Sequence, residues 1–144
     1  MNQKQKEVAT GIVIGVLITL AFAVKVMAAP VTSEEANLLA CTVQAEAGNQ
    51  SFTGRRLVAA VVLNRVESPM FPDTVGEVLS QKGQFSTYSK LGHTKPTWQD
   101  RLAVQMEIEE RSNHEVLFFN CGGYIPGTDK LMKYQDHYFS TIKK

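Results

Sequence analysis

Glu46 is the residue whose position most strongly indicates chemistry. It follows Leu39 by seven residues and Val43 by three, which places it on the inward-facing stripe of a helix expected to end at about Ala47. The C-terminus of a helix carries partial negative charge, and apolar neighbours make an ionised carboxyl costly. Both effects favour the protonated form, which can donate a proton to the leaving oxygen as a glycosidic bond breaks. On position alone, the alternative is a solvated glutamate at a frayed helix end.

Four helices are expected to position this carboxyl group. Hydroxyl side chains followed three residues later by a carboxylate predict the starts of three of them, at Thr32, Thr74 and Thr97. The second helix is predicted from apolar residues that recur on one face. The four expected helices cover about residues 33–47, 53–65, 75–82 and 97–113.

The fourth helix and the segment after it complete the expected fold. Trp98, Leu102 and Met106 recur every four residues and predict the buried stripe of that helix. Beyond it, residues 116–119 and 137–139 are short runs of β-forming residues, separated by glycine, proline and aspartate turn residues. The sequence therefore predicts an α+β fold, in which a helix-rich single domain ends in a small hairpin or sheet.

The composition limits the function further. The 144 residues include 15 lysines and arginines and 14 aspartates and glutamates, so there is no excess of positive charge to hold a nucleic acid. A hydrophobic fraction of 44% is ordinary for a folded protein. The length beyond the N-terminal segment matches one domain, expected over residues 30–144.

The N-terminal segment, residues 1–29, reads as a targeting segment. Lys4 and Lys6 precede the uncharged stretch 8–24, which as a helix would reach nearly across a bilayer. The residues before Pro30 also fit the cleavage site of a signal peptide. Both readings, a membrane anchor and a cleaved signal, export the domain, so we expect an extracytoplasmic protein, held at the membrane or secreted to the cell wall.

The two cysteines leave open whether a disulfide forms, and the cysteines and three histidines together argue against a metal site. Cys41 and Cys121 could form a disulfide outside the cytoplasm, or could be two unpaired small hydrophobic residues. There is no CxxC motif, and His93, His114 and His137 do not have the spacing of metal ligands. We therefore expect no metal site.

Six motifs follow one another along residues 30–144. They are "LLACTVQAEAG" at 38–48, "LVAAVVLNRV" at 57–66, "FPDT" at 71–74, "GQFS" at 83–86, the aromatic and glycine residues of 118–124, and "DHYFS" at 136–140. Each motif alone is weak, but their combination is specific. In this combination the chain resembles the cell wall hydrolases of the spore cortex-lytic type, and the similarity extends over nearly all of residues 30–144.

The resemblance implies a lysozyme-like fold and a lytic transglycosylase or related peptidoglycan hydrolase. In that family the catalytic glutamate lies in the "AEA" motif, which corresponds to Glu46 here. It would protonate the bond between N-acetylmuramic acid and N-acetylglucosamine and then act as base on the muramic C6 hydroxyl. A 1,6-anhydro sugar forms, and no cofactor is implied.

The sequence also offers candidates for substrate binding. Amides and hydroxyls can bond to sugar substituents, and aromatic rings can cover sugar faces. The candidates are Gln84, Phe85, Ser86, Tyr124 and His137. Phe85 could equally be a core residue, Tyr124 could pack in the core, and His137 could bond to a strand carbonyl.

Two other functions stay open. A wall amidase or peptidase would need zinc or a Cys-His pair, for which only Cys41 with His137 is available. A wall-binding membrane protein that has lost activity is the other alternative. Gln50 leaves room for it, because many relatives carry a second acidic residue shortly after the "AEA" motif.

Overall fold

A computed structural model describes residues 29–85 and 87–144 of the chain. Residues 1–28 of the expected targeting segment, which covers residues 1–29, lie outside the described residues, and so does Ser86. Within the described ranges, no helix has both the length and the hydropathy needed to cross a membrane. The helices are α2 (Ser33–Ala47), α3 (Phe52–Glu67), α4 (Val75–Ser80), the 3-10 helix η1 (Tyr88–His93) and α5 (Trp98–Glu109), and the strands are β1 (Phe118–Asn120), β2 (Thr128–Tyr134) and β3 (His137–Ile142).

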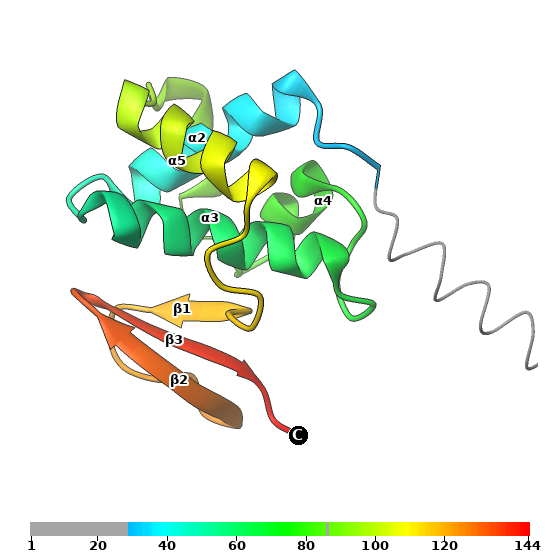
Figure 1. The fold of residues 1–144 in the computed structure, drawn as a ribbon, viewed down its shortest axis with the longest axis vertical. Helices are drawn as coiled ribbons and strands as arrows, with labels where there is room; N and C mark the ends of the chain where they lie inside the picture. The colour runs from blue at the N-terminus through cyan, green and yellow to red at the C-terminus, as the bar shows by residue number, and fades with distance from the viewer. Residues whose placement is uncertain (1–28, 86) are drawn as a thin grey trace, which may run out of the picture.

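Helix α3 runs through the middle of the molecule, with the other helices on one side and the sheet on the other (Figure 1). On the helical side, Val58 is buried in the main core cluster together with Leu39 of α2. On the sheet side, Val61 is buried against Phe139 of β3. Because α3 is covered on both sides, most of its residues are buried, and it is the framework to which the functional side chains are attached.

The predicted helix starts are confirmed. The side chains of Thr32, Thr74 and Thr97 each accept a hydrogen bond from the backbone N–H three residues later. At Thr32 and Thr97 the reciprocal bond is also present, so both are full capping boxes. These local bonds satisfy amide groups that the first helical turn leaves free.

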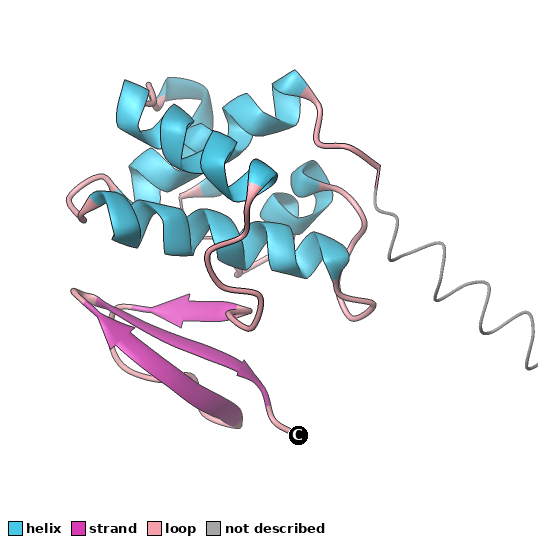
Figure 2. Cartoon of the chain, viewed as in Figure 1, coloured by secondary structure: helices cyan, strands magenta, loops and turns pink. Residues whose placement is uncertain are grey.

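The sheet has three antiparallel strands in the order β1-β3-β2. Figure 2 shows it as a separate layer below the helices. The sequence predicted β1 and β3, but not β2, whose polar residues leave it half-buried at one edge. β2 and β3 join through a tight turn in which Gln135 has a φ of 48°. The predicted helix-rich α+β fold with a small C-terminal sheet is confirmed.

The predicted buried stripe of α5 is wrong. Trp98 is 70% exposed and Leu102 is 42% exposed, whereas Ala103 and Val104 are buried. The packed face also buries Asp100 and Glu107, which form ion pairs with Arg55 and Arg56 of α3. The orientation of α5 is therefore fixed by small residues and by ion pairs to α3, not by its largest apolar side chains.

Candidate active site

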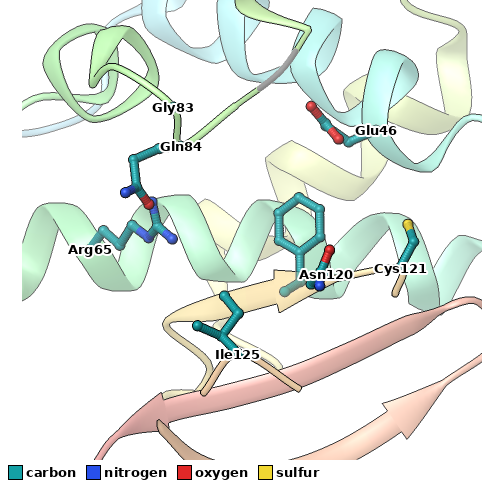
Figure 3. Close-up of a pocket in the computed structure, with 8 residues that line it drawn as sticks. Glu46, Arg65, Gly83, Gln84, Asn120, Cys121 and Ile125 are labelled. Atoms are coloured by element: carbon teal, nitrogen blue, oxygen red, sulfur yellow. The ribbon is translucent and has the colours of Figure 1, made fainter. Parts of the chain in front are cut away.

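Glu46 lies half-buried at the edge of a pocket of about 370 Å³ between the helices and the sheet. Figure 3 shows Glu46 on one side of this pocket and Gln84 with Arg65 on the other. The pocket is therefore formed where α2, α3, the 83–87 loop and β1 meet. Its lining residues are Glu46, Arg65, Gly83, Gln84, Phe119, Asn120, Cys121 and Ile125.

The end of α2 holds Glu46 in place. Gly48 follows α2 in right-handed helical conformation, with a φ of −61°. A Cβ at Gly48 would lie 2.4 Å from the carbonyl oxygen of Gln44, so only glycine fits. The Arg55 guanidinium donates hydrogen bonds to the Gly48 carbonyl and to Gln44 Oε1. A buried cation from α3 thus satisfies the carbonyl end of α2.

Thr87 is a site residue that the sequence reasoning missed. Its hydroxyl donates a hydrogen bond of 2.5 Å to Glu46 Oε1. Thr87 directly follows the "GQFS" motif at 83–86, so the loop selected for sugar binding contacts the carboxyl group itself. Thr87 and Glu46 are 41 residues apart, so spacing in the sequence could not connect them. The position of Thr87 next to that motif was the one feature of the sequence that could have identified it as a site residue.

The five predicted substrate-binding residues have different outcomes. Gln84 lines the pocket, and its Oε1 accepts a hydrogen bond of 3.0 Å from Arg65. Phe85 is only 5% exposed and belongs to the core, so it covers no sugar face. Tyr124 packs edge-on against Tyr138, at 5.1 Å between ring centroids, and does not line the pocket. Ser86 lies outside the described residues.

His137 is also outside the pocket lining, but it contacts Phe119, which belongs to that lining. It is 1% exposed, and its ring packs edge-on against Phe119, at 5.0 Å between centroids. Burial lowers the pKa of His137, while the nearby carboxylates of Glu46 and Asp136 act in the opposite direction. The imidazole is therefore neutral at pH 7 and supports the wall of the pocket through Phe119.

Gln50 has a structural task. It is 6% exposed, and its Nε2 donates to Asp136 Oδ2 at 2.8 Å and to Asn49 Oδ1 at 2.8 Å. Nearby, Ser51 N–H donates to Gln135 Oε1 at 2.7 Å. These bonds fasten the turn between β2 and β3 to the loop between α2 and α3, and so hold the sheet against the acid-bearing helix.

The two cysteines are unpaired. Cys41 is buried, whereas Cys121 is exposed at the pocket. Among the described residues, no hydrogen bond joins the buried Cys41 thiol to His137, whose Nδ1 has no hydrogen-bond partner there. The Cys-His pair considered for an amidase is therefore not assembled in this structure.

A family model for cell wall hydrolases matches residues 49–140, which is more than half of the chain. The chain belongs to the cell wall hydrolase family. The resemblance found in the sequence is thereby confirmed. Glu46 itself lies just before the matched range.

Two curated relatives are spore cortex-lytic enzymes. The one from Bacillus subtilis (strain 168) is 35% identical over 115 residues, which cover 75% of this chain and 38% of the relative. The one from Oceanobacillus iheyensis is 38% identical over 55 residues, or 38% of this chain and 20% of the relative. The chain thus spans less than half the length of either relative.

Two solved structures share the fold. The catalytic domain of the Bacillus cereus SleB protein superposes with a TM-score of 0.70 at 24% identity, covering 77% of this chain and 92% of that domain. The catalytic domain of a germination-specific lytic transglycosylase, SleB from Bacillus anthracis, gives 0.67 at 24% identity, covering 76% and 96%. The helix-rich domain with its small sheet is therefore the fold of these catalytic domains.

Proposed function

We propose that the chain is an enzyme that cleaves the glycan strands of peptidoglycan between N-acetylmuramic acid and N-acetylglucosamine, as a lytic transglycosylase with Glu46 as its acid and base. The observation that carries this proposal is that Glu46 is the only carboxylate among the described residues that line the pocket. A reaction that needs one carboxyl group, rather than the usual pair of glycosidases, matches that lining. Membership of the cell wall hydrolase family supports the substrate class.

The chemistry follows from the two oxygens of Glu46. Because Thr87 donates to Oε1, that oxygen is an acceptor, and the transferable proton belongs on Oε2. Oε2 gives this proton to the glycosidic oxygen as the bond to muramic C1 breaks. The resulting carboxylate then removes the proton of the muramic C6 hydroxyl while O6 bonds to C1. Glu46 is protonated again, and a 1,6-anhydromuramic end is formed without water.

The test compares products and variants on purified peptidoglycan. The full chain in non-ionic detergent should release fragments that end in 1,6-anhydromuramic acid, as identified by mass spectrometry. Glu46→Gln, which keeps the shape of the side chain but cannot transfer a proton, should abolish release. Glu115→Gln, at an exposed glutamate in the loop before β1, is the matched control and should cleave like the unchanged chain.

Other products would contradict the proposal in different ways. Reducing muramic ends would mean that water attacks C1, as in a hydrolytic muramidase. Freed peptides would indicate an amidase. Undiminished cleavage by Glu46→Gln would remove the assigned acid, and no release by the unchanged chain would favour a wall-binding protein without activity.

The place of action is also part of this proposal. We expect the domain to work outside the cytoplasm, delivered by the targeting segment at residues 1–29. Residues 8–24 carry no charge, which is the feature that supports export. Fractionation of cells that make the tagged chain tests this expectation, since recovery of the full-length chain in the cytosol would contradict it.

A further inference from the structure

Arg65 is a buried cation at the pocket that has no carboxylate partner among the described residues. It is 3% exposed, yet its side chain contributes to the pocket lining. Its Nε donates to the carbonyl oxygen of Leu117 at 2.7 Å, and its Nη1 donates to Gln84 Oε1 at 3.0 Å. Three rings surround the guanidinium at 5.0 to 5.3 Å, those of Phe71, Phe85 and Phe118.

The comparison with Arg55 shows that this arrangement is unusual within the same helix. Arg55 is about as buried, at 7%, and forms an ion pair with the fully buried Asp100. A buried charge is costly unless it is paired, and aromatic faces recover only part of that cost. Burial lowers the pKa of Arg65 to about 10, which still leaves the group charged at pH 7. The positive charge of Arg65 is therefore available to an anion in the pocket.

Gln84 adds a donor to the same end of the pocket. Because Oε1 of Gln84 accepts from Arg65, its Nε2 is turned away from the guanidinium and is free to donate. No described residue accepts a hydrogen bond from Gln84 Nε2 or from Arg65 Nη2. Figure 3 shows the two side chains together, across the pocket from Glu46. One end of the pocket thus offers a cation and an amide donor, and the other end offers the acid.

We propose that Arg65 and Gln84 form a subsite for the carboxylate of a muramic lactyl group from which the peptide stem has been removed. The inference rests on the proposed glycan cleavage. A muramic residue carries its lactyl group on C3 and its scissile bond on C1, so one sugar ring can place the carboxylate and the reacting oxygen at opposite ends of the pocket. A guanidinium matches a carboxylate in charge and in planar geometry.

The subsite also places the reaction in a sequence. In peptide-bearing strands the lactyl carbonyl is part of a neutral amide, which gives Arg65 no charge to bind. Hydrolysis of that amide by a wall amidase creates the free carboxylate. The preferred substrate is therefore the product of an amidase-class reaction, a glycan strand without stems.

The experiment uses one set of strands in two forms. Stem-free strands are prepared by amidase digestion, and half of them are converted to neutral lactyl methylamides with a carbodiimide and methylamine. The full chain in non-ionic detergent should cleave the carboxylate form with a kcat/KM about tenfold higher than the methylamide form. The preference should fall as salt is added, because the interaction is electrostatic.

Gln84→Glu separates binding from folding. The new carboxylate would pair with Arg65 and occupy the guanidinium, so the variant should unfold at the same or a higher temperature and yet lose the preference for carboxylate strands. Arg101→Gln changes the net charge by the same one unit at an exposed arginine of α5 and should keep the preference. Arg65→Lys, where it folds, keeps the charge without the planar fork and should show a reduced preference.

The outcomes are distinguishable. Equal cleavage of both forms by the unchanged chain, or an undiminished preference in Gln84→Glu, would overturn the subsite while leaving glycan cleavage intact. Strands whose stems are reduced to a single alanine test a carboxylate displaced along the peptide, and cleavage as fast as that of the lactyl form would also overturn the assignment. Failure to cleave any of these strands would overturn the proposed function, and the subsite with it.

Discussion

Replacement of Thr87 by valine removes the hydroxyl donor of Glu46 and leaves the size of the side chain nearly unchanged. The 2.5 Å hydrogen bond from Thr87 reaches Oε1 both before and after the proton leaves Oε2. A hydrogen bond to a neutral oxygen contributes about 0.5–1.5 kcal/mol, and one to a charged group about 1.5–3 kcal/mol. The hydrogen bond thus stabilises the carboxylate of Glu46 more than the neutral acid by about 1–1.5 kcal/mol. Losing this difference lowers kcat by about five- to twelvefold.

The assay is the initial rate of anhydromuramic product formation at saturating glycan, with the unfolding temperature measured in parallel. Thr87→Ser keeps the hydroxyl and should retain most of the activity, which makes it the matched control. Thr87→Val should fold normally, because the hydroxyl bonds to the half-buried Glu46 side chain and not to a residue of the core. A kcat of Thr87→Val within twofold of the unchanged chain, with the fold intact, would refute the assigned role of the hydrogen bond.

Three further predictions concern neighbours of the site. Burial lowers the pKa of His137, so below the ordinary histidine pKa of about 6.5 the unfolded chain takes up a proton that the folded chain does not. The free energy of unfolding should therefore be highest above that pH and decline below it. Urea unfolding should show a smaller decline between pH 7 and 5 in His137→Phe, and an unchanged decline would contradict this. Burial, followed by two nearby carboxylates, raises the pKa of Cys121; iodoacetamide should therefore react with it more slowly than with a free thiol at pH 8, and complete alkylation should block cleavage, whereas buried Cys41 should react only after unfolding. Gln50→Glu would place a carboxylate against Asp136, and it should lower the unfolding temperature more at low salt than at high salt, because salt screens the repulsion between the two groups. An equal loss at both salt concentrations would argue against repulsion.

Local chemistry explains what could be predicted from the sequence. The hydroxyls of Thr32 and Thr97 satisfy amides three residues away, so the helix starts were visible in the order of residues. The orientation of α5 depends on ion pairs such as Arg56 with Glu107, whose partners are 51 residues apart. Periodicity could not reveal such pairs, and for that reason it assigned the exposed Trp98 to the core.

The same limit applies to the site. Glu46 could be found because its motif is continuous, but Thr87 and Arg65 became site residues only when the loop and α3 were brought beside α2. Phe85 illustrates the reverse case, since it belongs to the right motif and yet lies in the core, where it packs near the Arg65 guanidinium. A motif identifies which segment reaches a site, whereas only packing decides which of its side chains face the substrate.

The neutral amide at position 50 fits the proposed single-carboxyl chemistry. Gln50 donates to Asp136 and accepts from its backbone N–H at 3.4 Å, so both ends of the amide are used to hold the β2–β3 turn. An acid at this position could accept from the backbone but would repel the Asp136 side chain. The Gln50 amide therefore holds the sheet against the end of α2. Glu46 is the one carboxylate among the described residues that line the pocket. Gln50 therefore has a structural role in this chain, and an amide at this position removes no group that the proposed mechanism uses.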